Sequence, residues 1–335
     1  MISAKNFTDV SWATHIDLKT GRPVENPSAR YNTTGKFFHS RQNPNGAHTW
    51  HSMSFSPQTG LVYIPIHTSN FVFAHDKAYK PRLMGANLGV DFSGNAPASA
   101  KAAEEALASV QGRLIAWDPV AQKEVWRVER AGPANGGALS TAGGIVFQGT
   151  GMGEFTALDA RTGETLWSSQ VHTGVMAAPI AYEIDGRQYV AIIAGSGGSW
   201  GMIGGEANIK GNNLPNISRL LVFAIGGTAT LPPPPPRPQR TLSPPPATAT
   251  PQVVAAGAAA YGAFCSNCHG AGAVSLGILP DLRYSGALRS AEPWRAIVID
   301  GTLGDNGMAS FATVLDEQAA EAIRAFVIAQ AHATR

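Results

Sequence analysis

The chain has 335 residues and a formal net charge of +2; 44% of its residues are hydrophobic and only 14% are charged. This length predicts two domains with enough apolar residues for real cores. The balanced charge and the absence of a basic run argue against a nucleic acid partner. No apolar stretch approaches the length of a membrane span.

Two stretches of the N-terminal region repeat one pattern. Residues 116–126 and 157–167 each place an aspartate, a turn and a tryptophan at matching positions, and residues 15–21 form a weaker copy without the tryptophan. The interval between Asp118 and Asp159 lies in the range of propeller blades. Aspartate and glycine also suit the tight turns between strands. The alternative is unrelated hairpins, which the repeated flanking strands disfavour.

The segments around these turns predict three propeller blades and the tail of one before them. The inner strands are expected at 51–56, 137–141 and 177–182, the second strands at 60–65, 144–149 and 189–194, and the third strands at 113–117, 154–158 and 219–224. Insertions at about 67–111 and 196–218 separate second from third strands, with a short helix at 101–110. The last blade ends after its third strand. Because propellers close with four to eight blades, residues 1–227 are predicted to form an all-β partial propeller of about three and a half four-stranded blades. Its open ends would expose unpaired strand edges.

Residues 228–252 are rich in proline and are interpreted as a linker. Runs of proline at 232–236 and 244–246 favour an extended, semi-rigid spacer between domains. The alternative is a ligand for SH3-like modules.

Residues 253–335 are predicted to form a small all-α domain around Cys265-Ser-Asn-Cys268-His269. C-x-x-C-H is the attachment pattern of a c-type haem, in which both thiols bond to the haem and the histidine ligates the iron. A four-cysteine zinc site is excluded because the chain has only these two cysteines. A mixed zinc site would need another histidine at ligand spacing, and none follows until His332. A disulfide would leave His269 unexplained. Helices are expected at 253–264, 293–300 and 315–331, from apolar residues at helical spacing.

Met308 is the candidate for the second iron ligand. It stands in a glycine-rich loop before the last helix, and a thioether opposite an imidazole is usual in electron-transfer cytochromes. A core methionine is the alternative. The order of helix, haem motif, loop, methionine and helix resembles the class I cytochrome c fold. Within that resemblance, Pro280 matches the proline whose carbonyl orients the haem histidine.

The N-terminal residues and the haem motif lead to different expectations about export. Residues 1–6 have no apolar core of a signal peptide, whereas haem is attached to c-type cytochromes outside the bacterial cytoplasm. The expectation is a periplasmic protein whose true start lies upstream, or a fragment.

The whole chain resembles the last part of the quinohaemoprotein alcohol dehydrogenases. The resemblance is carried by residues 2–7, 46–55, 60–63, 112–119 and 146–150. In that family an eight-bladed propeller holds pyrroloquinoline quinone (PQQ) and calcium, and a haem domain receives the electrons. The resemblance therefore implies haem c and PQQ as cofactors, with calcium held by ligands outside this chain.

Four positions are implied to contact PQQ. The family's Asn-Trp pair falls on Thr49 and Trp50, and Asn135 and Val175 fall at or beside further contacts. Residues 48–50, 134–136 and 173–175 each precede a predicted inner strand, so they are expected to open on one face of the propeller. Without the family, Trp50 could equally be a core tryptophan, and the His48–His51 pair is more often structural than metal-binding.

Two departures limit the implied site. Thr49 replaces the family's asparagine, and the chain starts after the family's catalytic aspartate, quinone-contacting lysine, calcium ligands and vicinal cysteines. The resulting hypothesis is the C-terminal portion of a PQQ-dependent alcohol dehydrogenase, which passes electrons from a primary alcohol through the haem to a copper protein, a cytochrome or a quinone. Its catalytic base would lie in a missing N-terminal half of the propeller. The alternative is a truncated chain that acts only as a haem-binding electron-transfer module.

Overall fold

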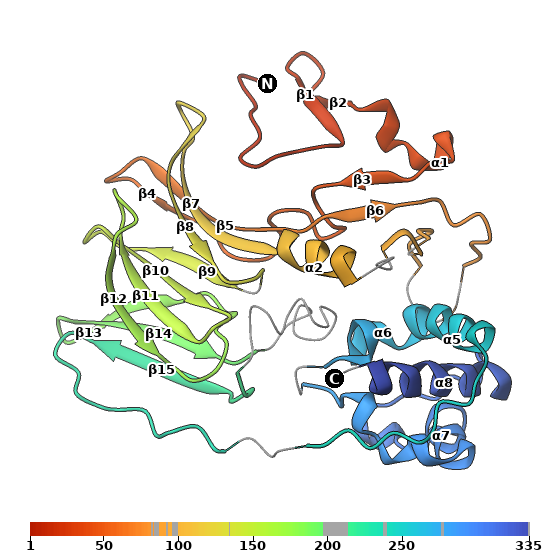
Figure 1. The fold of residues 1–335 in the computed structure, drawn as a ribbon. Helices are drawn as coiled ribbons and strands as arrows, with labels where there is room; N and C mark the ends of the chain where they lie inside the picture. The colour runs from red at the N-terminus through yellow and green to blue at the C-terminus, as the bar shows by residue number, and fades with distance from the viewer. Residues whose placement is uncertain are drawn as a thin grey trace. The chain divides into compact units, whose positions relative to one another are not determined.

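The computed structural model describes residues 1–81, 83, 87–91, 93–95, 100–133, 135–196, 214–236, 240–275 and 278–333. The chain divides into two compact units (Figure 1). The sheet unit contains the described residues of 1–79, 89–196 and 214–234, and the helical unit contains those from 235 onward together with those between 80 and 88. The division falls inside the predicted linker, whose described residues between 228 and 249 form no helix or strand.

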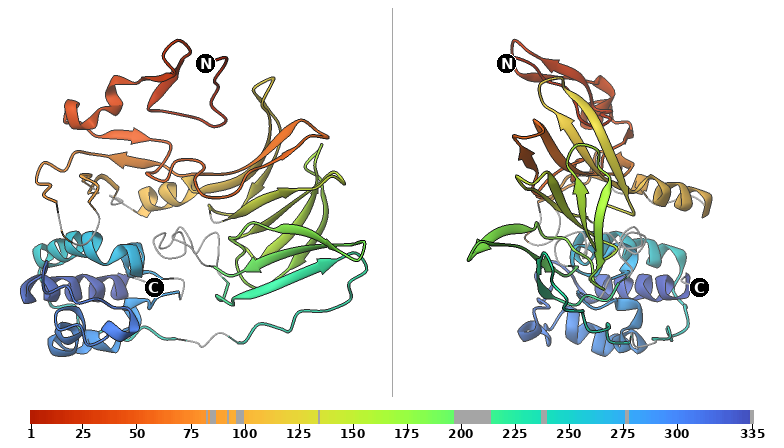
Figure 2. Two further views of the ribbon diagram at one scale, coloured as in Figure 1. Left: turned by 180° about the vertical axis from the view of Figure 1, so that it is seen from behind. Right: turned by 90° about the vertical axis from the view of Figure 1, so that its left-hand side faces the viewer.

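Three antiparallel sheets follow one another along the sheet unit (Figure 2). Their strand orders are β4-β5-β7-β8, β9-β10-β11-β12 and β13-β14-β15. The bounds are β4 Ser54–Ser56, β5 Leu61–Thr68, β7 Gln111–Asp118, β8 Lys123–Arg130, β9 Asn135–Ser140, β10 Ile145–Thr150, β11 Glu154–Asp159, β12 Thr165–Gln170, β13 Ile180–Ile184, β14 Arg187–Ala194 and β15 Arg219–Ala224. The three predicted blades are confirmed, including the three-stranded last one.

Two smaller sheets accompany the blades. β1 (Ala13–Asp17) pairs with β2 (Arg22–Glu25), and β3 (Phe38–Ser40) pairs with β6 (Phe71–Phe73). The hairpin of β1 and β2 is the predicted tail of the preceding blade. The β3–β6 pair lies partly in the predicted insertion at 67–111 and was missed, because strands of three residues show no periodicity. The connections contain α1 (Tyr31–Thr34), α2 (Ala100–Ser109) and 3-10 turns at Pro27–Ala29 and Ser93–Asn95.

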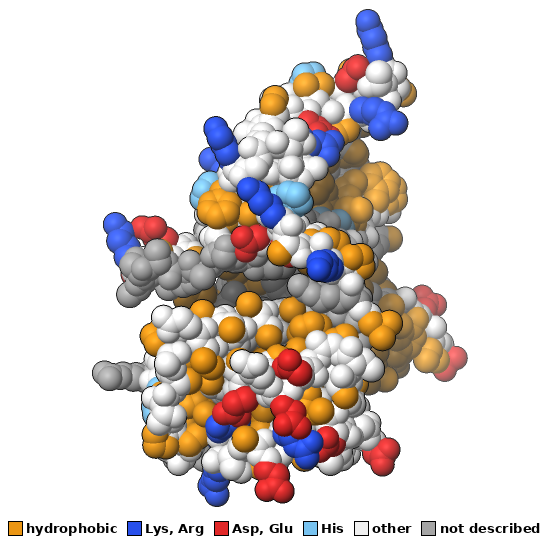
Figure 3. Space-filling view, turned by 90° about the vertical axis from the view of Figure 1, so that its right-hand side faces the viewer, with side chains coloured by type: hydrophobic (Ala, Val, Ile, Leu, Met, Phe, Trp, Pro, Cys, Tyr) orange, Lys and Arg blue, Asp and Glu red, His pale blue; other side chains and the backbone are white. Residues whose placement is uncertain are grey.

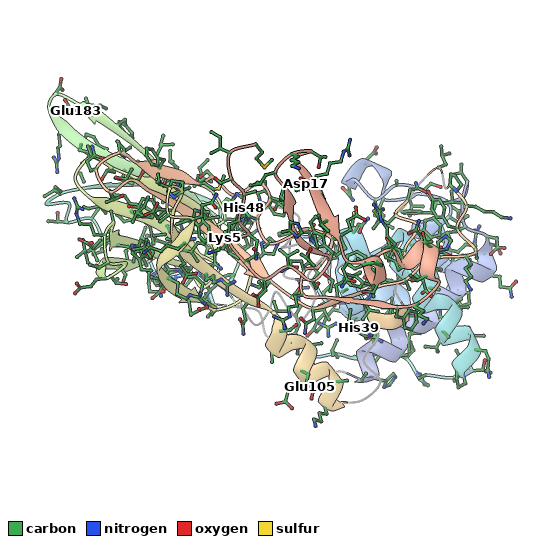
Figure 4. The ribbon with its side chains drawn as sticks, turned by 90° about the horizontal axis from the view of Figure 1, so that it is seen from above. Lys5, Asp17, His39, His48, Glu105 and Glu183 are labelled. Atoms are coloured by element: carbon green, nitrogen blue, oxygen red, sulfur yellow. The ribbon has the colours of Figure 1, made fainter. Side chains whose placement is uncertain are left out.

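The repeated aspartates make the expected turns. Asp17 accepts hydrogen bonds from Lys19 N and Thr20 Oγ1, and Asp159 accepts them from Arg161 N and Thr162 N. Asp118 accepts from Val120 N and Ala121 N in the same way. These bonds satisfy backbone donors that a tight turn leaves unpaired. The hairpins at 15–21, 116–126 and 157–167 are therefore one repeated unit. Asp17 is labelled in Figure 4.

Apolar cores fill the spaces between neighbouring blades. The first and second blades share Tyr63, Leu114, Val146 and Leu158, all fully buried. Tyr63 Oη and Trp126 Nε1 both donate to Ala160 O, at 2.9 and 3.1 Å. The second and third blades share a second core, whose buried residues are Phe155, Val171, Val175, Val190, Ile192, Ala194 and Leu221.

The outer face of the third blade is uncovered in the described part of the chain. Paired residues of β13, β14 and β15 place five aliphatic side chains on it, each at least 49% exposed: Ile180, Ile184, Ile193, Leu220 and Val222. Val190, Ile192 and Ala194 of β14 and Leu221 of β15 are buried in the core shared with the second blade. An exposed apolar face of this kind is typical of a surface that packs against another blade.

The described residues of the helical unit form four helices and short 3-10 turns. The helices are α5 (Pro251–Phe264), α6 (Ser266–His269), α7 (Ala291–Val298) and α8 (Glu317–Ala333). The turns lie at Ala271–Ala273, Leu282–Tyr284, Gly286–Arg289 and Gly304–Asn306. The side chain of Thr250 caps α5, and Asp316 accepts from Ala319 N at the start of α8. The three predicted helices are confirmed, with boundaries shifted by a few residues.

A single core holds the helical unit together. Tyr261 of α5, Trp294 of α7 and Ile323 of α8 are buried in it, and Trp294 Nε1 donates to Ala320 O at 2.8 Å. On the surface of this unit, acidic and basic side chains lie beside one another among apolar ones (Figure 3). None of the described helices combines the length and apolar character that a membrane crossing requires.

Candidate functional site

The C-x-x-C-H motif lies where α5 gives way to α6. Cys265 ends α5 and precedes α6, which contains Cys268 and ends at His269. His269 N donates to Cys265 O at 2.9 Å, so one helical turn brings the three side chains onto one side of the backbone. Cys265 and His269 are each 7% exposed, whereas Cys268 is exposed, and neither thiol is in a disulfide. Burial, with a smaller effect of Cys268, raises the pKa of the Cys265 thiol to about 12.

His269 is held in one orientation by the backbone. Its Nδ1 lies 2.8 Å from Pro280 O. A carbonyl oxygen can only accept, so the proton is on Nδ1 and the Nε2 lone pair is left for a metal. The hydrogen bond expected between Pro280 and His269 is therefore present.

Tyr261 supports the end of α6, a role that the sequence did not reveal. Its ring is 2% exposed, and its hydroxyl donates to Gly270 O at 2.8 Å. Burial raises the pKa of this hydroxyl, so it stays protonated and remains a donor. Gly270 has a φ of 82°, which lets the chain turn directly after His269.

Met308 lies in an ordered loop that packs on the helical core. Its side chain is half-buried against that core, and its backbone N donates to Leu303 O at 3.1 Å. Phe311 N donates to Val298 O at 2.8 Å and ties the end of the loop to α7. Phe264, Leu282, Phe311 and Val314 are also only partly buried against the core. Two free thiols, an imidazole with a free Nε2, a half-buried thioether and nearby apolar side chains fit the chemistry of a haem c.

The implied quinone residues differ in how far they are exposed. Thr49 is exposed and Trp50 is 50% exposed. Asn135, expected to precede its inner strand, is the first residue of β9; it is 4% exposed, donates to Gly132 O and accepts from Gly151 N. Val175 is fully buried in the core between the second and third blades. Thr49 and Trp50 alone of the four thus offer exposed side chains.

The segments that carry these residues do lie side by side. Ala138 N donates to Ser52 O at 2.9 Å, which joins the segment before β4 to β9. A side chain at Gly136 would come within 3.0 Å of Val175 O, which places β9 against the segment before β13. The three segments are therefore neighbours, and their opening on one face of the propeller stays a prediction. Ala134 and residues 197–213 of the second insertion lie outside the described residues.

Two buried histidines behind Trp50 were missed as a feature. The Trp50 ring stacks on His51 at 5.0 Å between centroids, and the His51 and His67 rings meet edge to face at 6.1 Å between centroids. Both ring nitrogens of His51 are buried without a hydrogen-bond partner in the described structure. Burial lowers the pKa of His51 and of His67 to about 4, with a further contribution from neighbouring histidines. They were missed because the feature that marks these two histidines is burial, and a sequence pattern does not show burial.

His48 serves the backbone in this region. Its Nδ1 bonds to Pro65 O at 2.8 Å, and the residue is labelled in Figure 4. Among the described residues, no three histidine, cysteine or acidic side chains are placed to hold a metal ion. His48 thus bonds to the backbone, whereas the ring of His51 makes no such bond in the described structure.

Two parts of the chain match known protein families. Residues 102–190 match the beta-propeller domain of glucose, ethanol and alcohol dehydrogenases, and residues 252–327 match subunit III of cbb3-type cytochrome c oxidase.

Relatives with similar sequences extend over nearly all of the chain. Quinohemoprotein alcohol dehydrogenase ADH IIB of Pseudomonas putida is 44% identical over 98% of this chain and 46% of its own length. The 1-butanol dehydrogenase (cytochrome c) of Thauera butanivorans is 39% identical over 100% of this chain and 47% of its own length. The chain spans about half the length of the curated relatives it matches.

Solved structures show the same coverage. Quinohemoprotein alcohol dehydrogenase ADHIIG of Pseudomonas putida superposes with a TM-score of 0.90 at 38% identity, covering 99% of this chain and 48% of that one. The quinohemoprotein alcohol dehydrogenase of Comamonas testosteroni superposes with a TM-score of 0.81 at 36% identity, covering 100% of this chain and 48% of that one.

Proposed function

Because the chain is built as the C-terminal part of a quinohaemoprotein alcohol dehydrogenase, with a partial PQQ-type propeller and a cytochrome c domain, we propose that it takes part in alcohol oxidation in the periplasm. In this proposal a primary alcohol is the substrate, and an external copper protein, cytochrome or quinone is the final acceptor. In this proposal the calcium ligands and the catalytic base belong to the part of the propeller that this chain does not contain.

One observation carries the electron-transfer part of the proposal. The Pro280 carbonyl holds His269 with Nε2 free, directly after two unpaired thiols. A haem c bound there supplies one-electron transfer. The chain's own residues then have separate tasks. Cys265 and Cys268 would hold the haem covalently, His269 and Met308 would be the iron ligands, and Pro280 would orient His269.

The sheet unit supports the quinone part of the proposal. Trp50 presents a half-exposed aromatic face, held from behind by the ring of His51. A planar quinone can stack on such a face with its apolar surface covered. Thr49 is the exposed polar neighbour, while Asn135 and Val175 would contribute by shaping the surrounding backbone.

Covalent attachment is tested by extraction. Chain produced with the haem attachment machinery is expected to keep its colour through acid–acetone extraction, because thioether bonds survive denaturation. Loss of all colour would refute a c-type haem.

The Met308→Ala variant is expected to stay coloured, to lose the sulfur-to-iron band in the near infrared and to have a lower potential. Met152→Ala, at an exposed methionine of the sheet unit, is the matched control and should keep the band.

A second candidate function is a haem-binding electron-transfer module without dehydrogenase activity. It is favoured by the fact that all the haem residues lie in the helical unit alone. The two candidates differ in whether alcohol and PQQ reduce the haem once the upstream half of the propeller is present.

A further inference from the structure

A buried ion pair stands directly beside the carbonyl that holds His269. Arg283 and Asp281 have side chains only 8% and 11% exposed. In every other ion pair formed by the described residues, at least one side chain is more than 40% exposed. Removing two charges from water is costly unless their geometry is good and their remaining hydrogen bonds are made. A pair of this kind therefore calls for a specific explanation.

The Asp281 carboxylate is fully engaged with its surroundings. The Arg283 guanidinium forms a fork on it, with Nε 2.9 Å from Oδ1 and Nη2 2.7 Å from Oδ2. The carboxylate also accepts from Arg283 N at 3.1 Å and from Ser275 N at 3.3 Å. Ser275 Oγ donates to Leu279 O at 2.6 Å. One carboxylate thus ties the residues before Pro280 to the turn after it.

Pro280 lies inside this clamp. Its carbonyl belongs to the planar peptide unit shared with Asp281, so holding Asp281 in place restricts the direction of the carbonyl. That carbonyl accepts from His269 Nδ1 at 2.8 Å. A displacement of Asp281 would therefore reach the imidazole through a single hydrogen bond.

We propose that the Asp281–Arg283 pair is a positioning device for the haem ligand, which fixes His269 through the Pro280 carbonyl and sets the haem potential. The inference rests on the proposed haem site. In this proposal neither residue would be an iron ligand: Asp281 would act through Pro280, and the charges of both residues would act through their field at the site.

Two physical effects connect the pair to the potential. A firm hydrogen bond from Nδ1 makes the imidazole more electron-rich, which favours the oxidised iron. The two opposite charges also cancel near the site; an uncancelled negative charge favours the oxidised iron, and an uncancelled positive charge favours the reduced iron. Breaking the pair from one side or the other should therefore shift the potential in opposite directions.

The test compares single-residue variants of the full chain with its haem attached. Arg283→Met removes the cation but leaves Asp281 bonded to two backbone amides, so the potential is expected to fall. Asp281→Asn leaves the cation and weakens the hold on Pro280, so the potential is expected to rise. The double variant is expected to lie between the two. Glu321→Gln is the matched control: it breaks the pair of Glu321 with Arg324, in which Glu321 is 43% exposed, and should leave the potential near that of the parent.

A second measurement separates positioning from charge alone. The paramagnetically shifted haem methyl signals of the oxidised protein report the orientation of the histidine plane. Asp281→Asn should rearrange them, whereas Glu321→Gln should not. The inference is overturned if both single variants shift the potential in the same direction, if neither differs from Glu321→Gln, or if the methyl pattern of Asp281→Asn is unchanged. Failure of the proposed function looks different, because the parent chain itself would then hold no covalent haem.

Discussion

The two units of this chain build their candidate sites in different ways. In the helical unit, the thiols, the imidazole and the carbonyl that orients it come from residues 265–280, and the hydrogen bond between His269 and Pro280 lies within this segment. In the sheet unit, the candidate quinone residues come from three blades; Asn135 and Val175 are buried, whereas Thr49 and Trp50 are exposed. A site made from one short segment survives in part of a protein, whereas a site at the centre of a propeller needs every blade around it.

Exposed surfaces show the same difference. The core of the helical unit is closed by α5, α7 and α8. The third blade instead leaves Ile193 and Leu220 more than 60% exposed on a face without a neighbour in the described chain. We therefore expect the helical unit to work by itself and the sheet unit to work only when the propeller is completed.

The largest expected effect is on haem reduction, which should depend on completing the propeller. Residues 1–335 with attached haem, PQQ, calcium and ethanol should not reduce their haem above background, since the proposed base and calcium ligands lie elsewhere. A placed base by itself is worth about 10²–10⁴-fold in rate. Adding the upstream half of the propeller should restore reduction, measured by haem absorbance. Calcium-dependent reduction by the chain alone would contradict this expectation and would show that the sheet unit works without the rest of the propeller.

Acid should weaken the sheet unit through its buried histidines. Unfolded histidine binds a proton near pH 6.5, whereas the pKa of His51 and of His67 in the folded chain is about 4. Between these values the unfolded state takes up more protons, so the free energy of unfolding falls as the pH is lowered from about 6.5 to 4. The loss is roughly 3 kcal/mol for each histidine. Urea unfolding followed by tryptophan fluorescence measures it.

Substitution identifies the histidines responsible. His51→Phe should reduce this acid-dependent loss, whereas the same change at His39, an exposed residue of β3 labelled in Figure 4, should leave it intact. An equal acid dependence in His51→Phe and the unaltered chain would show that other groups control it.

The stability of the helical unit should depend on the close packing of α5 against α8. A Cβ at Gly257 of α5 would lie 1.9 Å from Ala322 O of α8, a backbone atom that cannot rotate away. Gly257→Ala is therefore expected to cost about 1–3 kcal/mol of stability. Gly262 lies in the same helix with no atom within 4 Å of its added Cβ, so Gly262→Ala should stabilise the unit by about 0.5–1 kcal/mol. Urea unfolding followed by haem absorbance compares them, and equal effects would mean that α5 and α8 are not in this contact.

The smallest expected effect tests how the first two blades are joined. Tyr63 is fully buried, and its hydroxyl bonds to Ala160 O and Thr59 Oγ1. Tyr63→Phe should cost about 1 kcal/mol, because Trp126 Nε1 still donates to Ala160 O. Tyr182→Phe, in the half-buried ring stacked on Tyr189, is the control. Indistinguishable unfolding curves for the two variants would show that this inter-blade bond adds nothing.

Local patterns made much of the fold predictable. The Asp-turn-Trp repeat indicated the hairpins, and the similar segments around these turns placed the strands of all three blades. The haem motif and Pro280 were also readable, because neighbouring positions of one helical turn and one loop determine their geometry. The position of Met308 relative to His269 depends on packing between α5, α7 and α8 and stays a prediction.

The sequence by itself determined the repeated turns, the strand and helix order and the group of residues able to hold a haem, since each depends on interactions among near neighbours in the chain. Only the tertiary structure decided that His51, Asn135 and Val175 are buried, that β3 pairs with β6, and that Asp281 and Arg283 form a buried pair beside Pro280. Burial and long-range pairing depend on which distant segments pack together. The energy of those contacts cannot be inferred from any short stretch of residues.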